Sequence, residues 1–204
     1  MSFHPLMPYG TAAFHRSERA LLPTGEPFAY TPDRAKALEA ICSNYPPERR
    51  KSAVLAALYL VQEQQGYISA NGARAVAEFL RITPAEVEDV VTYYVMFHRA
   101  PVGKYVLQVC RTLSCALAGA ERVTEALGEK LGLKVGETDA SGTFTLLEFE
   151  CLGACDRAPV VMVNNEHWHE RATADSCSKL VDDLRQHGLN ALSGCHLHVE
   201  AKRQ

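Results

Sequence analysis

Two pairs of closely spaced cysteines are the residues in this chain best suited to chemistry. Cys110 and Cys115 are separated by four residues in CRTLSC, and Cys151 and Cys155 by three residues in CLGAC. The chain has seven cysteines, an odd number, in 204 residues. A domain of this size does not depend on disulfides for stability, so clustered cysteines indicate a metal site or redox chemistry.

Three kinds of chemistry fit four thiols. Zinc favours four cysteines in a tetrahedron, but its ligands usually come in pairs separated by only two residues. Redox disulfides usually occupy a C-x-x-C motif at a helix start, which neither pair forms. A [2Fe–2S] cluster takes two thiolates per iron, and wider loops such as C-x4-C suit it. The spacing favours the cluster over zinc, and zinc over disulfide chemistry, and leaves all three open.

The elements that must position the two pairs are strands. Residues 104–109 and 143–150 are predicted strands, with Cys110 and Cys151 where each strand gives way to a loop. A right-handed crossover through a helix over residues 116–131 makes these strands parallel neighbours. Both cysteine loops then leave the same edge of the sheet, where four thiols can meet.

The remaining pattern completes a compact domain with a mixed sheet over residues 99–190. Asn164 and Asn165 predict a turn between two short strands. The further elements expected are strands over 159–163 and 167–171 and a helix over 174–186.

Upstream, residues 33–98 predict a small helical bundle, so the fold class is α+β. Ser69 can cap one helix, and Thr83-Pro84-Ala85-Glu86 is a start signal that combines an N-cap, a first-turn proline and a capping box. Earlier helical pieces are expected over residues 33–44 and 48–65.

The two ends of the chain lack helical or strand periodicity. Residues 1–32 are rich in proline and glycine and predict an irregular arm, which could order only against a partner. At the other end, a loose tail is expected after the last helix, over residues 189–204, or 191–204 at its narrowest.

Composition narrows the classes of function. The net charge of −3 gives no general attraction for nucleic acid or anionic lipid. No apolar run is long enough to cross a bilayer, and the first 30 residues lack the pattern of a secretory signal. We therefore expect a protein of a reducing, cytoplasmic compartment, with no direct insertion into a membrane.

The other cysteines and the histidines predict simpler roles. Cys42 and Cys177 are expected to pack inside helices as small hydrophobic residues. The His-x-His pairs at residues 167–169 and 196–198, the latter beside Cys195, are expected to be solvated rather than metal-binding.

The sequence also resembles a known family, the 24 kDa subunit of NADH:quinone oxidoreductase, or respiratory complex I. ECLGACDRAPVVMVN is similar to that family's second cluster loop, and VGKYVLQVC to its first strand. The resemblance extends upstream through RRKSAVLAALYLVQEQQGYIS and VEDVVTYYVMFHRAPVGKY, and covers roughly residues 33–187.

The resemblance implies a thioredoxin-like domain that holds one [2Fe–2S] cluster behind a helical bundle. Carried over by position, Cys110 and Cys115 bind one iron, and Cys151 and Cys155 bind the other. Around the ligands, Gly153 lets the backbone approach closely, and Thr112 and Ser114 donate hydrogen bonds that raise the reduction potential. Pro159 stands where thioredoxin-like folds often have a cis proline.

The implied partner is the flavoprotein subunit that binds NADH and FMN, together with other peripheral-arm subunits. This chain then exchanges single electrons with the flavin on the inner face of a bacterial membrane. It has no NADH or quinone site of its own, and neither G-x-G-x-x-G nor a P-loop occurs in the sequence. The alternatives are the equivalent subunit of an NAD-linked hydrogenase or formate dehydrogenase, and an interaction module stapled by zinc on four cysteines without a redox role.

Overall fold

The computed structural model describes residues 24–192, and these residues divide into two compact units between Val102 and Gly103. The first unit is helical, and the second contains a sheet with helices. The α+β class expected from the sequence is confirmed, with helices upstream of a mixed sheet. The division of the chain into arm, bundle, cluster domain and tail stays a proposal.

The first unit buries an apolar core among its helices. Leu38, Leu58, Val76 and Val87, each from a different helix, are fully buried. The helices are α1 (Pro32–Cys42), η2 (Pro47–Ala53), α2 (Val54–Gln65), α3 (Ala70–Leu80) and α4 (Pro84–Tyr93).

The predicted start signals of this unit are confirmed. Ser69 accepts a hydrogen bond from the Gly72 amide at 3.0 Å, and Thr83 and Glu86 form a reciprocal capping box. One prediction was wrong, because residues 48–65 do not form a single helix. A 3-10 segment ends at Ala53, whose ψ of 4° breaks the helical course before α2 starts.

The part of the arm that the structure describes belongs to the bundle. Residues 24–31 form neither helix nor strand, as expected. Phe28 and Tyr30 nevertheless pack on the bundle core, and the Tyr30 hydroxyl donates to the Ala57 carbonyl at 3.0 Å. This segment therefore orders against its own chain. Residues 1–23 lie outside the described part.

The second unit alternates strands and helices in the expected order. It contains β1 (Tyr105–Cys110), α5 (Leu113–Leu117), α6 (Ala120–Leu131), β2 (Phe144–Phe149), η3 (Cys155–Arg157), β3 (Val161–Val163), β4 (His167–His169), α7 (Ala174–His187) and η4 (Gly188–Leu192).

Its four-stranded sheet has the order β2-β1-β3-β4. The first two strands are parallel, as predicted, and Cys110 lies opposite Phe149 in the register. Strand β3 runs antiparallel to both β1 and β4, so the sheet is mixed. Asn164 and Asn165 both have positive φ and make the β3–β4 turn, where asparagine tolerates the left-handed conformation.

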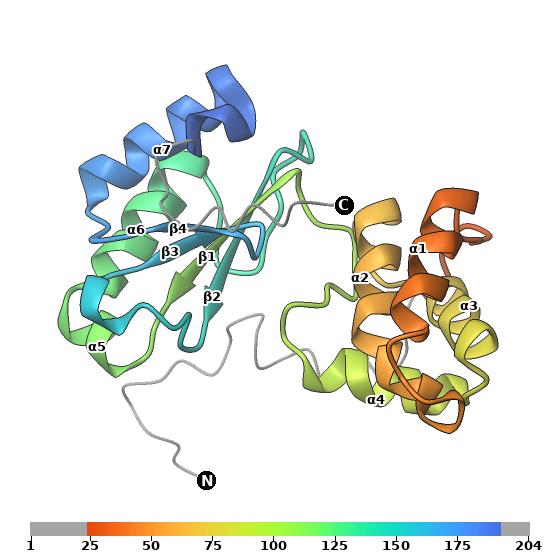
Figure 1. The fold of residues 1–204 in the computed structure, drawn as a ribbon. Coiled ribbons are helices and arrows are strands. Elements are labelled where there is room, and N and C mark those ends of the chain that lie inside the picture. Colours follow the sequence, from red (N-terminus) through yellow and green to blue (C-terminus); the bar gives the residue numbers. More distant parts are fainter. Residues whose placement is uncertain (1–23, 193–204) are drawn as a thin grey trace, which may run out of the picture. The chain divides into compact units, whose positions relative to one another are not determined.

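Helices α6 and α7 lie side by side against the sheet (Figure 1). Val123 and Leu127 of α6 and Leu184 of α7 share one buried core with Leu107 and Leu146 of the parallel strands. This apolar layer fixes the sheet that carries both cysteine pairs.

Two sequence-based boundaries were wrong in this unit. Residues 116–131 were expected as one helix, but Gly119 takes a φ of +98° and separates α5 from α6. Cys115 consequently lies within α5 rather than in a loop. The tail was expected to be loose after the last helix, but residues 188–192 form η4, and Leu192 joins the core. Residues 193–204 lie outside the described part.

Candidate metal centre

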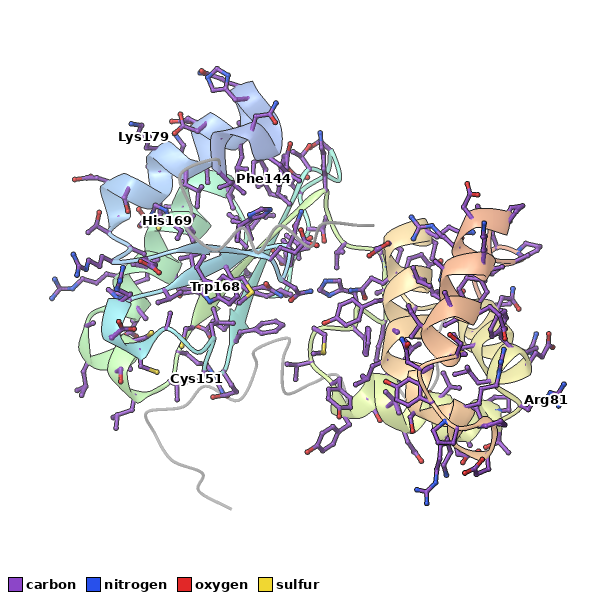
Figure 2. All side chains as sticks on the ribbon, viewed as in Figure 1. Arg81, Phe144, Cys151, Trp168, His169 and Lys179 are labelled. Carbon is purple, nitrogen blue, oxygen red and sulfur yellow. The ribbon has the colours of Figure 1, made fainter. Side chains whose placement is uncertain are left out.

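Both cysteine pairs emerge at the same edge of the sheet. Cys110 is the last residue of β1, and Cys151 follows the end of the adjacent parallel strand β2 by two positions. Figure 2 labels Cys151 in this region of the second unit. Cys115 lies in α5 and Cys155 opens η3, so each pair joins a strand end to a short helical turn.

The two thiols of the first pair are buried and hydrogen-bonded to each other. Cys110 and Cys115 are each 2% exposed. Burial raises the pKa of Cys110, but hydrogen bonds from Thr112, Cys115 and the Leu152 amide outweigh it, so its pKa lies below the ordinary value. Burial and the hydrogen bond to Cys110 raise the pKa of Cys115 to about 11. Of the two thiols, Cys110 therefore gives up its proton more readily than Cys115.

The second pair is exposed to solvent. The sulfurs of Cys151 and Cys155 lie 3.4 Å apart. The Gly153 amide donates to the Cys151 sulfur at 3.4 Å, from a backbone with φ of +83°. The hydrogen bond with Cys151, followed by the charge of that group, raises the pKa of Cys155. A tight turn thus aims a backbone donor at sulfur, in keeping with the close backbone approach predicted for Gly153.

Each of the two loops also donates a hydrogen bond to a cysteine sulfur of the other loop. The Leu152 amide of the second loop donates to Cys110, and the Ser114 hydroxyl of the first loop donates to Cys155. The Thr112 hydroxyl lies 3.7 Å from the Cys110 sulfur. All three residues predicted to surround the cysteines therefore contact a sulfur.

Three backbone amides that sequence reasoning missed belong to the same network. The Thr112 and Leu152 amides donate to Cys110, and the Val160 amide donates to Cys115. Trp168 of β4 helps to hold the second cysteine loop in place, because its indole Nε1 donates to the Leu152 carbonyl at 2.9 Å. Backbone donors carry no side-chain signature, so only the fold reveals them.

The donor set fits a two-iron cluster. Each iron of a [2Fe–2S] cluster takes two thiolates, and the thiols here form two close pairs with N–H donors aimed at three of the four sulfurs. In residues 24–192, no three histidine, cysteine or acidic side chains converge closely enough to hold a single ion. The arrangement is therefore one of pairs rather than of a formed single-ion tetrahedron.

Charged residues follow the second pair directly. Arg157 forms ion pairs with Asp156 at 3.3 Å and with Glu170 at 2.7 Å. The opposite charges of Asp156 and Arg157 are thus joined on the surface beside Cys155. The peptide bond from Ala158 to Pro159 is cis.

Within residues 24–192, the other cysteines and the histidine pair of β4 make contacts of their own. Cys42 is buried in the helical unit and Cys177 in α7, which confirms their predicted packing roles. His169 Nε2 is 2.9 Å from the Ser176 hydroxyl, and His167 is 3.8 Å from a Glu166 oxygen. Cys195, His196 and His198 lie outside the described residues.

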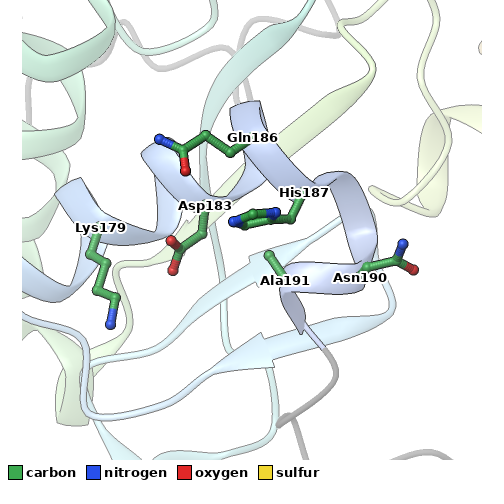
Figure 3. Close-up of a pocket in the computed structure, with 6 residues that line it drawn as sticks. All are labelled: Lys179, Asp183, Gln186, His187, Asn190 and Ala191. Atoms are coloured by element: carbon green, nitrogen blue, oxygen red, sulfur yellow. The ribbon is translucent and has the colours of Figure 1, made fainter.

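A cavity on the second unit lies over α7 and η4 (Figure 3). Its volume is about 720 Å³, and none of the residues predicted to form a site contributes to it. The lining consists of Lys179, Asp183, Gln186, His187, Asn190 and Ala191.

Paired thiols at the edge of a mixed sheet, with amides donating to sulfur, define the class of iron–sulfur proteins built on a thioredoxin-like fold. Residues 38–185 match the family described as thioredoxin-like [2Fe–2S] ferredoxin. The chain belongs to this family and carries one [2Fe–2S] cluster. Both the resemblance and the cofactor predicted from the sequence are thereby confirmed.

Two relatives are subunits of one enzyme. The chain is 40% identical over 153 residues to NADH-quinone oxidoreductase subunit 2 of Thermus thermophilus, a match that covers 75% of this chain and 84% of that protein. It is 41% identical over 165 residues to the NADH-quinone oxidoreductase E subunit of Mycobacterium bovis, across 79% of this chain and 64% of that protein.

A solved structure shares the fold. The crystal structure of an NAD+-reducing [NiFe]-hydrogenase in the air-oxidized state superposes with a TM-score of 0.57 and 19% identity. The match covers 65% of this chain and 23% of the hydrogenase chain. Across residues 24–192, we find no helix with the length and apolar character needed to span a bilayer.

Proposed function

We propose that Cys110 and Cys115 bind one iron of the cluster and that Cys151 and Cys155 bind the other. The two close pairs at one sheet edge support this assignment. A bound [2Fe–2S] cluster supplies one-electron chemistry, accepting and returning a single electron. Thr112, Ser114 and the Gly153 amide contact the sulfurs, and hydrogen bonds to ligand sulfur raise a reduction potential.

The two pairs divide the work of holding the cofactor. Cys110 and Cys115 lie in the domain core, which excludes water from that side. Cys151 and Cys155 are exposed, so the second pair is the side that a redox partner can approach. The Leu152 amide and the Ser114 hydroxyl tie the two loops together and hold the pairs in register.

The chain as a whole serves, in this proposal, as an electron-transfer subunit of NADH:quinone oxidoreductase. The observation that carries this role is the 40% identity to a subunit of that enzyme across 84% of the relative's length. The cluster exchanges single electrons with the FMN of the NADH-binding flavoprotein subunit, and this chain binds neither NADH nor quinone. It is a peripheral-arm subunit on the inner face of a bacterial membrane.

Affinity purification of the tagged chain from its own cells tests this role. The expected result is copurification with a flavoprotein that oxidises NADH and with a membrane quinone reductase, and a rhombic [2Fe–2S] EPR signal after one-electron reduction. Recovery of a hydrogenase or a formate dehydrogenase instead contradicts the proposed complex. That outcome does not contradict the assignment of the four cysteines as cluster ligands. Stoichiometric zinc without an EPR signal, in anaerobically prepared protein, contradicts the electron-transfer role itself.

A further inference from the structure

An arginine and a glutamate stand at the mouths of the two cysteine loops. Arg111 follows Cys110 directly, and Glu150 directly precedes Cys151. The parallel register pairs Cys110 with Phe149, so Arg111 and Glu150 occupy the next rung of that ladder. The Arg111 amide donates to the Phe149 carbonyl at 2.9 Å, which carries the strand pairing one residue beyond β1.

The side chains of this rung are joined by a close ion pair. Arg111 Nε and Nη2 donate to one oxygen of Glu150 at 3.1 and 3.0 Å. Arg111 Nη1 lies 3.9 Å from Glu148, and this guanidinium and the Glu148 carboxylate are each about four-fifths buried. The burial of Arg111 shields its charge from solvent, whereas the Glu150 side chain is 56% exposed, so the Arg111–Glu150 ion pair is shielded on the arginine side only.

Glu148 lies close to Arg111 and feels several charges. Burial raises the pKa of Glu148, and the carboxylates of Glu121 and Glu150 raise it further while Arg111 opposes them. Arg111 thus lies between the carboxylates of Glu148 and Glu150 and directly follows a cysteine of the first pair.

We propose that the Arg111–Glu150 ion pair clamps the two cysteine loops together and balances the charge beside the cluster, so that it helps to set the reduction potential. The ion pair runs from one loop to the other, so both residues act as positioning residues. The inference rests on the proposed ligand set, because it needs Cys110 and Cys151 to hold the same cluster. A nearby positive charge favours the reduced, more negative cluster, and a negative charge disfavours it.

The test measures the midpoint potential of the purified holoprotein by EPR-monitored redox titration. Arg111→Gln should lower the ratio of reduced to oxidised cluster at a fixed potential by about two- to fivefold, and Glu150→Gln should raise it by a similar factor. In the double variant the ratio should return towards the parent value, because both charges are gone. If the ion pair has a purely structural role, the midpoint potentials of both single variants shift in the same direction, or neither shifts.

The clamp has a separate readout in cluster retention. All three variants, the double variant included, should lose the cluster to a chelator about two- to fivefold faster than the parent. Lys130 and Asp182 form an ion pair of 2.8 Å between α6 and α7 in the same unit, so Lys130→Gln and Asp182→Asn are matched controls that should change neither potential nor retention.

The outcomes separate this inference from the ligand assignment. Potential shifts of equal sign, or unchanged potentials with unchanged retention, overturn the role of the ion pair. If Cys110→Ser and Cys151→Ser still abolish the parent EPR signal in that case, the proposed ligands stand. If those serine variants keep the parent EPR signal, the ligand assignment is wrong, and the ion-pair proposal that rests on it is wrong as well.

Discussion

The two cysteine pairs occupy opposite environments within one site. Cys110 and Cys115 sit on regular elements, in the core shared by β1, α6 and α7. Cys151 and Cys155 sit on an exposed turn that depends on one left-handed glycine and on a hydrogen bond from Trp168 to Leu152. The first pair is therefore held by the fold, and the second by a few local contacts.

This difference separates two tasks that a redox site must combine. A buried pair keeps water and competing reagents from one side of a cofactor, whereas an exposed pair lets a partner approach closely. The same asymmetry implies that the second loop is the less stable half when no cluster is bound, because local stability follows buried apolar contacts.

Serine substitution should produce the largest effects. Cys110→Ser and Cys151→Ser should each abolish or strongly alter the [2Fe–2S] EPR spectrum, because each removes a thiolate. Only Cys110→Ser should also destabilise the cluster-free fold, by about 1–3 kcal/mol, since it buries a hydroxyl where Cys110 is 2% exposed. EPR and urea unfolding measure the two effects.

Cys177→Ser is the matched control for those variants. It also buries a hydroxyl in the same core and should lower stability, but it should leave the spectrum unchanged. Bleaching of the Cys177→Ser protein shows that the ligand assignment is wrong.

Alkylation of the cluster-free protein should distinguish the pairs next. At pH 8, a neutral reagent should modify Cys151 and Cys155 at least roughly tenfold faster than Cys115, because Cys115 is buried and the thiolate is the reactive form. The pKa of Cys115 is about 11, so its labelling should accelerate as the pH rises towards that value. Peptide mapping by mass spectrometry gives the order, and equal rates for all four cysteines contradict the asymmetry.

Two glycines offer a smaller and more local test. Gly119 and Gly153 both have positive φ, and a Cβ at either position meets no atom within 4 Å, so alanine brings backbone strain without a clash. Each alanine variant should lose about 1 kcal/mol of stability. Only Gly153→Ala should speed the loss of the cluster to a chelator, since the Gly153 amide donates to Cys151. Equal cluster loss in both variants contradicts a specific role for this turn.

Mild acid should have the smallest effect. Burial lowers the pKa of His169 below its usual 6.5, so its contribution to stability is present above that value and is lost as the pH falls through the lowered pKa. Urea unfolding of the cluster-free protein at pH 7.5 and 5.5 should show a drop that His169→Gln reduces. An identical drop in both proteins assigns the acid sensitivity to other groups.

The position of both cysteine pairs at one sheet edge could be predicted from the sequence, because it depends only on the order and direction of the strands. Apolar strands before Cys110 and Cys151, with one crossover helix between them, suffice to place both at one edge. The family resemblance then selected the cluster among three occupants that the spacing allowed. The cap signals at Ser69 and Thr83 were equally readable, because capping depends on residues only three apart.

Other features depend on contacts between distant residues or on backbone groups. The bond from Trp168 to Leu152 joins β4 to a loop 16 residues earlier, and no local pattern announces it. The break at Gly119 was missed because a single glycine inside a helical pattern is often tolerated. The Arg111–Glu150 pair was readable in principle, since each residue adjoins a cysteine and the parallel register aligns them.

The hydrogen bond from Trp168 to the second cysteine loop also makes this tryptophan an intrinsic fluorescence probe of that loop. Trp168 is the only tryptophan among the 204 residues, so all indole fluorescence comes from this one position. Its Nε1 donates to Leu152, whose amide in turn donates to Cys110. Indole emission thus reports on the loop between Cys151 and Cys155. Loading of the cofactor and opening of that loop can therefore be followed in the unlabelled protein.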